Sequence, residues 1–543
     1  MLFRNPRPDY CSAIAAAAIA LAGANAAAET DAGYTPAAGT TIGEIRFERQ
    51  NIFDVDNPEE NVWLYRLVNR FHILTRESTI RDQLLFHEGD VFDARQLEES
   101  ARILRNNKYL FDATIEPSPN MDGTVDLTVT TRDVWSLTPE LAFSRSGGEN
   151  EWDFGFEESN LFGTGQRVLL VHSESVDRDA NTFEYSNPQI GQSWVGTTLR
   201  LADASDGQTG FFAMTKPFHE LDARTAGGVS VFNDDRVDSL YVLGERAAEY
   251  RQERDFVSAF VGISNGLQNG WVRRWTAGIV YDDVDFSEPR KPDLPLVLPE
   301  NRKLVFPYLG FDIFEDRFEK ASNFNQMERS EDFYFGRRFA GTLGWSETGF
   351  GSDRDALIYA LTASRGFGNL DGQALIAAID LRGRIESGDT ANATSRIDLR
   401  YSWRQSDRML FFARLDGTLG HDLDLDTPIE IGGNSGLRGY PLRYQSGDSR
   451  VLISMEQRYF TDWYPFRLVR VGAAVFADAG RTWGDDPLGG ENLGWLTDVG
   501  FGLRLAPTRF GTDKVFHVDV AFPLDGDDSI DDVQILFEAK RSF

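Results

Sequence analysis

The sequence predicts an all-β transmembrane barrel of about 16 antiparallel strands or more, preceded by a small α+β domain. From about Trp135 to Phe543, apolar and polar residues alternate with a period of two, and clusters of Asp, Gly, Asn and Ser separate the segments. An apolar stretch with small-residue cleavage sites stands near the N-terminus. The chain ends on an alternating segment whose last residue is Phe. These three observations together favour a barrel over other β-rich folds.

Composition narrows the class of partner. The 543 residues carry 55 Lys+Arg against 85 Asp+Glu, a formal net charge of -30, which argues against nucleic acid because phosphate binding needs a basic surplus. A single Cys excludes a disulfide framework or a Cys-based zinc site. Beyond residue 28 no run of 18 apolar residues occurs, so the sequence predicts no membrane-spanning helix.

Residues 1–28 have the pattern of a secretory signal peptide. Arg4 and Arg7 precede an apolar run from about Ser12 to Gly23. Two A-x-A cleavage sites follow, Ala24-Asn25-Ala26 and Ala26-Ala27-Ala28. A disordered leader or a membrane anchor is the alternative, but the apolar core is short for a span. Cys11 would leave with this segment, and residues 29–41, rich in Ala, Gly, Thr and Pro, are expected to form a flexible lead-in.

Residues 42–134 are expected to form the small α+β domain. A short alternating strand begins at Ile42, and a helix is expected over residues 61–69. A second helix has Asp93 as its N-cap with Gln96 three residues on. Two strands follow, over residues 109–116 and 124–130, joined by a turn. The order is strand, helix, helix, strand, strand.

This order and texture resemble a POTRA domain, the periplasmic module of outer-membrane assembly proteins. The resemblance rests on the stretches 80–90, 97–100, 104–105 and 109–111. It implies that the domain contacts client chains by adding a strand to its sheet edge. A plain structural spacer is the alternative.

Residues 135–543 are expected to form the barrel, with a secreted β-sandwich as the alternative. In Ile397–Trp403 the apolar face is opposed by Asp398, Arg400 and Ser402, and full charges of this kind suit a water-filled lumen. At roughly 25 residues for each strand and its connection, about 400 residues give about 16 strands, whereas a count of segments reaches about 20. Five strands are expected after Arg450: Val451–Tyr459, Val469–Asp478, Thr497–Leu505, Val515–Phe522 and Val533–Phe543. Ile535, Phe537 and Phe543 make a C-terminal strand signal typical of outer-membrane proteins.

A Gly-rich segment before these five strands contains Leu437-Arg438-Gly439-Tyr440. It resembles the Arg-Gly-Phe/Tyr loop motif of the BamA/TamA-like outer-membrane assembly superfamily. The resemblance implies a loop that folds back into the lumen and is followed by five strands. The turn at residues 160–166 resembles that family's turn after the second strand.

Arg438 inside a lumen would need a fixed counter-charge. In Val469–Asp478 the alternation places Asp478 on the inner face, where it matches the acidic partner that the family resemblance implies. Glu456 faces inward by the same parity and is a second candidate. A bidentate Arg–carboxylate pair would fix the loop. A solvated Arg in a surface loop is the alternative.

The sequence gives no support for an enzyme, a cofactor or a metal site. His172-Ser173 lacks the surroundings of a hydrolase, and adjacent His and Ser are mostly incidental. The run from Asp422 to Asp426 could touch a divalent ion, but a solvated acidic loop is favoured.

The family resemblance implies an outer-membrane barrel, its POTRA domain in the periplasm, that assists insertion or translocation of proteins. Its partners would be outer-membrane lipids and unfolded or client proteins, bound at the POTRA edge and at a weakly closed seam between the first and last strands. The alternative is a passive pore or structural surface barrel without protein transport. Room for a single POTRA domain favours an accessory or specialised member.

Overall fold

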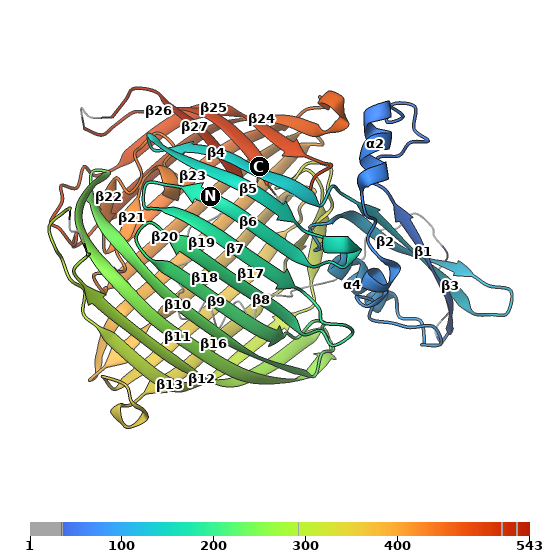
Figure 1. Ribbon diagram of the computed structural model, residues 1–543, viewed down its shortest axis with the longest axis horizontal. Helices are drawn as coiled ribbons and strands as arrows, with labels where there is room; N and C mark the ends of the chain where they lie inside the picture. The colour runs from blue at the N-terminus through green and yellow to red at the C-terminus, as the bar shows by residue number, and fades with distance from the viewer. Residues whose placement is uncertain are drawn as a thin grey trace.

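A computed structural model describes residues 34–542, apart from residues 35, 38, 291–292, 512–513 and 528–529. The expected signal peptide and Phe543 lie outside the described residues. In chain order the protein has a small α+β domain and then a closed barrel, and the domain lies at one end of the barrel (Figure 1). This end is called the near end below, and the opposite one the far end.

The α+β domain is a three-stranded sheet covered by helices. Its elements are β1 (Ile42–Gln50), α2 (Trp63–Phe71), α3 (Glu77–Arg81), α4 (Ala94–Arg105), β2 (Leu110–Pro119) and β3 (Val125–Asp133). In the sheet order β1-β3-β2, β1 is parallel to β3 and β2 is antiparallel to it. The Asp93 carboxylate caps α4 by accepting from the Arg95 backbone N–H at 2.9 Å. Ile80 of α3, and Leu97 and Leu104 of α4, pack on the sheet through Ile45 and Leu127.

The barrel closes with 20 antiparallel strands, the upper end of the expected range. They are β4 (Leu137–Ser146), β5 (Glu149–Glu158), β6 (Arg167–Glu174), β7 (Asp179–Asn187), β8 (Gly196–Ala204), β9 (Gln208–Lys216), β10 (Thr225–Val242), β11 (Glu245–Gln268), β12 (Trp271–Ser287), β13 (Arg302–Glu315), β16 (Arg338–Ser346), β17 (Ala356–Gly368), β18 (Gln373–Glu386), β19 (Asp389–Ser406), β20 (Met409–His421), β23 (Ser449–Phe460), β24 (Val469–Trp483), β25 (Leu496–Pro507), β26 (Val515–Pro523) and β27 (Gln534–Lys540). The last five confirm the strands expected after Arg450. The count exceeds 16 because β5–β9 are short and share short turns.

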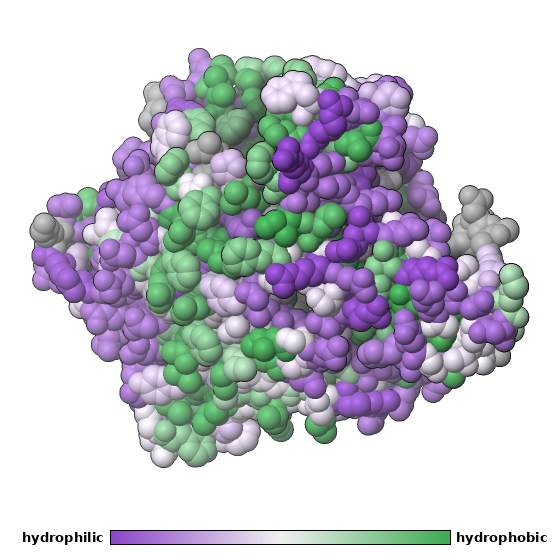
Figure 2. All heavy atoms as spheres, turned by 45° about the vertical axis from the view of Figure 1, so that its right-hand side comes forward, coloured by the Kyte–Doolittle hydropathy of each residue, from purple (hydrophilic) through white to green (hydrophobic). Residues whose placement is uncertain are grey.

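Because side chains alternate along each strand, the barrel wall has an apolar outer face and a polar inner face. On β24 the side chain of Val475 is 57% exposed on the outside, whereas Asp478 is 2% exposed on the inside. Figure 2 shows hydrophobic residues as a band across the barrel wall, with hydrophilic residues on its left-hand side. An apolar outer band and a charged interior are the pattern of a barrel in lipid. Among the described residues, the helices are too short or too polar to cross a membrane.

Residues 316–337, here called the mouth segment, connect β13 to β16 at the near end and contain the small hairpin β14 (Phe318–Ala321) and β15 (Glu331–Tyr334). The segment reaches the opposite side of the barrel: the Phe324 carbonyl accepts from Arg458 of β23 at 3.1 Å. Its apolar side chains join one cluster with residues from β18, β20 and β23–β26, namely Phe324, Met327, Phe335, Leu370, Ala374, Leu410, Phe460, Ala474, Ala506 and Val515. The mouth segment therefore lies across the near end of the lumen.

Candidate functional site: the lumen loop and the seam

Residues 422–448, here called the lumen loop, join β20 to β23 at the far end and include the strands β21 (Ile429–Ile431) and β22 (Gln445–Gly447). The Arg438 side chain, only 4% exposed, is the centre of its attachment to the wall. Its Nε donates to Asp478 Oδ2 at 2.7 Å and its Nη2 to Asp478 Oδ1 at 2.9 Å. Its Nη1 donates to Glu456 Oε1 at 2.7 Å. The structure thus brings both sequence-predicted carboxylates to the motif Arg.

The wall around Arg438 holds the guanidinium in one orientation. The ring of Phe476 lies under it, 3.5 Å from the guanidinium carbon to the ring centroid. Arg458 donates to the second Glu456 oxygen, Oε2, at 2.9 Å. Because β23 and β24 are neighbouring strands, the inward side chains at 456, 476 and 478 meet on one patch of the inner face. A bidentate pair so enclosed is both strong and specific in geometry.

The other motif residues bind β25 and the far-end connection between β26 and β27. The Gly439 backbone N–H donates to Asp498 Oδ2 of β25 at 3.0 Å, and a Cβ at this position would lie 2.8 Å from the Asp498 Cβ. The Tyr440 hydroxyl lies 2.8 Å from the Thr497 carbonyl and 3.0 Å from the Asp525 carbonyl, both hydrogen-bond acceptors. Leu437 and Tyr440 are fully buried. The motif therefore links the loop to β23, β24 and β25 at once.

The acidic run at 422–426 holds the loop as well, which differs from the solvated acidic loop that the sequence favours. Asp424 accepts two hydrogen bonds from Arg384, at 2.8 and 3.0 Å. Asp426 accepts two from Arg302, at 2.9 and 2.8 Å. Both arginines point inward from strands on other sides of the barrel, β18 and β13. Arginines thus neutralise Asp424 and Asp426 of the run, and no group of three His, Cys, Asp or Glu side chains that could hold a metal ion occurs among the described residues.

The lumen loop also touches the first hairpin of the barrel. Gly147 lies in the turn between β4 and β5 with φ of 58°, and a Cβ there would lie 2.3 Å from the Leu442 nitrogen. The close approach requires glycine at this position. Next to it, Arg443 makes a bidentate pair with Asp177 of the following turn, at 2.7 and 2.6 Å. The loop therefore contacts the wall on both sides of the junction between β27 and β4.

That junction, here called the seam, is the weakest ladder of the barrel. Among the described residues, only Phe537 and Arg145 are paired across it, whereas the neighbouring ladder between β26 and β27 runs from Val515↔Lys540 to Ala521↔Gln534. Phe143 supports the seam from β4, with its ring centroid 6.2 Å from that of Phe537. Of the predicted C-terminal signal residues, Ile535 is 58% exposed on the outside and Phe537 lies on the same outer face.

The α+β domain is attached to the near end by α4. Glu99 of α4 accepts from the Leu221 backbone N–H at 2.8 Å, and Leu221 lies in the turn between β9 and β10. Arg105 donates to Asp332 of the mouth segment at 3.3 Å. Burial raises the pKa of Glu99 to about 7, although the Leu221 N–H and the neighbouring Arg102 and Arg95 act in the opposite direction. The domain thus contacts both the wall and the mouth segment.

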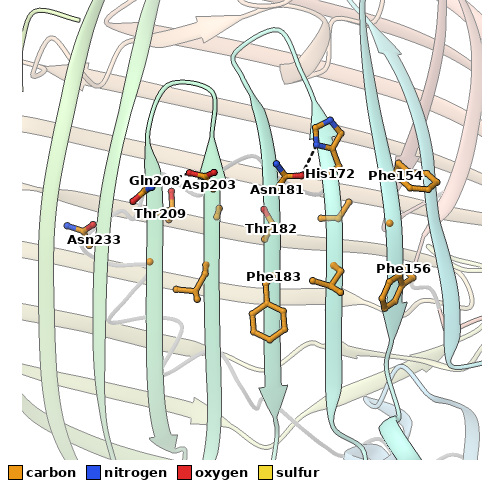
Figure 3. A pocket seen from close by; sticks show the side chains of 16 residues that line it. Phe154, Phe156, His172, Asn181, Thr182, Phe183, Asp203, Gln208, Thr209 and Asn233 are labelled. Carbon is orange, nitrogen blue, oxygen red and sulfur yellow. Dashed lines mark hydrogen bonds between the residues drawn. The ribbon is translucent and has the colours of Figure 1, made fainter. Parts of the chain in front are cut away.

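A shallow hollow of about 780 Å³ lies on the outer wall over β5–β10. Figure 3 shows His172, Asn181, Asp203 and Gln208 near the ends of the hairpins, and Phe183 and Phe156 farther from them. His172 Nδ1 lies 3.0 Å from Asn181 Oδ1. Because successive strand residues face opposite sides, His172 points outward and Ser173 inward, so this pair cannot act as base and nucleophile. The hollow marks where the apolar band gives way to polar residues.

Sequence reasoning missed the mouth segment and the attachment through α4. The signal for the mouth segment was the unusual length of the connection between residues 315 and 338 with its Phe324, Met327, Phe333 and Phe335. Glu99 carried no usable signal, since it lies on a helix among many other acidic residues.

Comparison with known proteins adds one family match. Residues 72–132 match the family model described as "POTRA: Surface antigen variable number repeat". No curated protein matches the chain. Among solved structures, BamA from Haemophilus ducreyi lacking POTRA domains 1-3 is similar at 13% identity, with 92% of this chain and 83% of that chain covered and a TM-score of 0.37. CdiB from Acinetobacter baumannii has 13% identity, 92% and 73% coverage and a TM-score of 0.45. CdiB from Escherichia coli has 14% identity, 92% and 76% coverage and a TM-score of 0.45.

The match falls within the α+β domain, which stands directly before the closed barrel with its apolar outer band. The chain is therefore a β-barrel membrane protein with one POTRA domain, as its resemblance to the BamA/TamA-like superfamily predicts.

Proposed function

We propose that this protein lies in the outer membrane of a Gram-negative cell, with its POTRA domain in the periplasm, and assists insertion or translocation of client proteins. The observation that carries the proposal is the seam, where one residue pair of the described chain, Phe537 and Arg145, joins the first and last strands. A strand without a partner presents a row of backbone donors and acceptors to any chain that can pair with it. Client strands would add to the edges of β4 and β27 in this way.

The lumen loop would keep the rest of the barrel in order while the seam opens. Arg438 holds the loop against Asp478 and Glu456, and Tyr440 holds it near Thr497. These contacts join β23, β24 and β25, which approach the seam from one side. Gly147 and Leu442 meet on the other side. We therefore propose a functional motif that supports the wall on both sides of the seam. It consists of Leu437, Arg438, Gly439 and Tyr440, with Asp478 and Glu456.

The chain segments that lie inside the lumen favour client transport through the seam over a passive pore through the lumen. The mouth segment crosses the near end, and its Phe324, Met327 and Phe335 are buried in one cluster with residues of the wall. The lumen loop enters from the far end and is attached to the wall by the ion pairs of Asp424, Asp426 and Arg438. A pore for small solutes needs a continuous water-filled channel, and both ends of this lumen carry ordered chain.

A disulfide across the seam tests the proposal. Cells depleted of the protein would be complemented with a chain carrying Arg145→Cys and Phe537→Cys, the one pair in register at the seam. Paired positions on neighbouring strands have the Cα separation that a disulfide requires. The oxidised chain should fail to restore a class of outer-membrane or surface proteins in quantitative proteomics, and a reductant should bring that class back.

The matched control carries Val520→Cys and Ile535→Cys, which are paired across the ordinary ladder of β26 and β27. This disulfide should leave client levels unchanged, because that ladder need not open. Full client levels with an oxidised seam would refute transport through the seam. Unchanged proteins with altered uptake of small solutes would favour the passive pore.

A further inference from the structure

Helix α2 stands apart from the core of the POTRA domain. The sheet packs against α3 and α4, whereas the one buried side chain of α2, Tyr65, joins a different cluster. This cluster contains Ile52 and Phe53 of the same domain and Leu468 of the barrel. In Figure 1, α2 lies beside the near end of the barrel, away from the sheet of its own domain. The helix therefore belongs, by its contacts, to the junction between domain and barrel.

Val68 is half-buried against the same cluster as Tyr65, and the other apolar residues of α2 face outward. With about 3.6 residues per turn, positions 63, 67, 71 and 64 fall within one stripe of the helix. Trp63 is 69% exposed, Leu64 47%, Leu67 39% and Phe71 68%. The stripe continues to Ile73, which is 55% exposed. Contact between water and a contiguous apolar stripe is unfavourable, so we expect an apolar surface to cover this stripe.

Two near-end turns of the barrel hold the helix on either side of the seam. The Tyr65 hydroxyl donates to the Phe466 carbonyl, in the turn between β23 and β24. Just after the helix, the Arg76 backbone N–H donates at 2.9 Å to the Gly163 carbonyl, in the turn between β5 and β6. Around the barrel, β25 and β26 lie between β24 and the seam strand β27, and β5 is the neighbour of the seam strand β4. The stripe is thus fixed at the near-end rim, on the side of the barrel that contains the seam.

The barrel turns beside α2 present aromatic side chains in the same region. Phe466 is 81% exposed, Trp463 63% and Phe162 62%. Aromatic residues at the rim of a membrane barrel sit at the level of the lipid headgroups. The α2 stripe therefore continues a surface of the barrel that already meets lipid.

The charge of α2 suits the same surface. The helix carries Arg66 and Arg70 and no acidic residue. Both arginines are exposed and lie next to the apolar stripe. Trp, Phe and Leu on one face with Arg beside them is the composition of helices that lie in a membrane interface, where basic side chains reach the anionic headgroups.

From these observations we infer that α2 is an interfacial helix, whose stripe of Trp63, Leu64, Leu67 and Phe71 enters the membrane leaflet that faces the POTRA domain, on the side of the barrel that contains the seam. The inference requires only that the barrel spans the membrane. The helix would attach the POTRA domain to lipid as well as to the barrel, on the side of the barrel where the seam lies.

Spin-label accessibility in a membrane tests this placement. The full chain with Cys11→Ser would carry a nitroxide at Leu67→Cys or Phe71→Cys and be placed in nanodiscs of phosphatidylethanolamine and phosphatidylglycerol. Oxygen concentrates in hydrocarbon and a nickel chelate stays in water. Labels at 67 and 71 should collide several-fold more with oxygen than with the chelate, as a label at the lipid-facing Phe501→Cys does.

Met121→Cys is the matched control, because Met121 is a fully exposed apolar residue at the tip between β2 and β3. Its label should favour the nickel chelate. If the labels at 67 and 71 behave like the one at 121, α2 lies in water and the inference is wrong. Protection from both reagents would show that protein covers the stripe, which also overturns it. The measurement needs no client, so it can fail or succeed independently of the proposed transport.

Discussion

The seam and the opposite wall are built by the same alternating pattern and differ in length and pairing. The strands β10, β11 and β12 have 18, 24 and 17 residues, and the ladder between β10 and β11 is continuous from Thr225↔Ile263 to Val242↔Glu245 except for one bulge. The seam strands β4 and β27 have 10 and 7 residues and share one pair. Cross-strand pairs are the unit of sheet stability. The barrel therefore concentrates its stability far from the place that is proposed to open.

The largest effect expected from one substitution is at Arg438. Arg438→Ala leaves Asp478 and Glu456 buried without this partner, and breaking a buried ion pair costs about 3–5 kcal/mol. The urea midpoint of the folded barrel should fall, and client levels in complemented cells should fall with it. Export of the chain to the periplasm should be unaffected, because the signal peptide that the sequence predicts lies at residues 1–28.

The opposite wall supplies the control for this prediction. Arg254 of β11 makes a bidentate pair with Asp282 of β12, at 2.8 and 2.7 Å, and is also buried. Arg254→Ala should lower the urea midpoint by a similar amount. It should leave client levels per folded barrel unchanged, since no contact to the seam is lost. Equal loss of activity in both variants would mean that overall stability, and not the lumen loop, controls function.

At the mouth segment the expected effect is on the conductance of the barrel, and the effect on client levels should be smaller than at Arg438. Phe335 is 1% exposed and packs against the backbone at Gly366. Phe335→Ala should remove about 3–5 kcal/mol of local packing and loosen the segment. Conductance of the barrel in planar bilayers should rise, because the near end of the lumen then opens.

Phe306→Ala is the matched substitution in the wall, where Phe306 is equally buried in a cluster with Val280 and Leu304. It should destabilise the barrel without raising conductance. Equal conductance in the two variants would contradict a closing role for the mouth segment.

The smallest effect expected is a pH dependence of POTRA docking through Glu99. Its pKa is raised from 4.5 to about 7, so its contribution to docking is complete below about pH 4.5 and is lost as the pH rises to about 7. At one pKa unit per about 1.4 kcal/mol, the change is at most about 3 kcal/mol. The protection factors of the α4 amides, which correct for the intrinsic pH dependence of exchange, should fall across this range while those of β11 stay high.

Glu99→Gln should remove that dependence, because an amide oxygen can still accept from the Leu221 N–H but does not titrate. An unchanged pH profile in this variant would assign the dependence to another group.

The sequence predicted correctly those features that follow from the alternation of side chains along a single strand. The period of two puts Asp478 and Glu456 on the inner face, and the structure shows both at Arg438. The five strands after Arg450 follow from the same rule. The total number of strands does not, because β5–β9 occupy residues 149–216 at about 14 residues each, and a mean spacing of roughly 25 hides them.

Features that depend on distant segments could not be predicted. The apolar residues of α2 identify an amphipathic helix, but amphipathicity does not tell whether the apolar face meets protein or lipid. The structure places the helix at Trp63–Phe71, two residues later than expected, with Trp63 and Phe71 outward. The strands β14 and β15, of four residues each, are too short for alternation to identify. These two strands pair with each other, and the wall residues that the mouth segment packs against are remote from it in the chain.

The place of the seam in the chain also determines the order in which the protein can assemble. Every other ladder of the barrel joins neighbouring segments, so each can form as soon as the next segment arrives. The ladder between β4 and β27 joins the first strand to the last and can form only after the whole ring has been made. Until then both strands carry open edges, which pair readily with other chains. The newly made protein therefore faces, in its own folding, the same problem of an unpaired strand that it is proposed to solve for its clients.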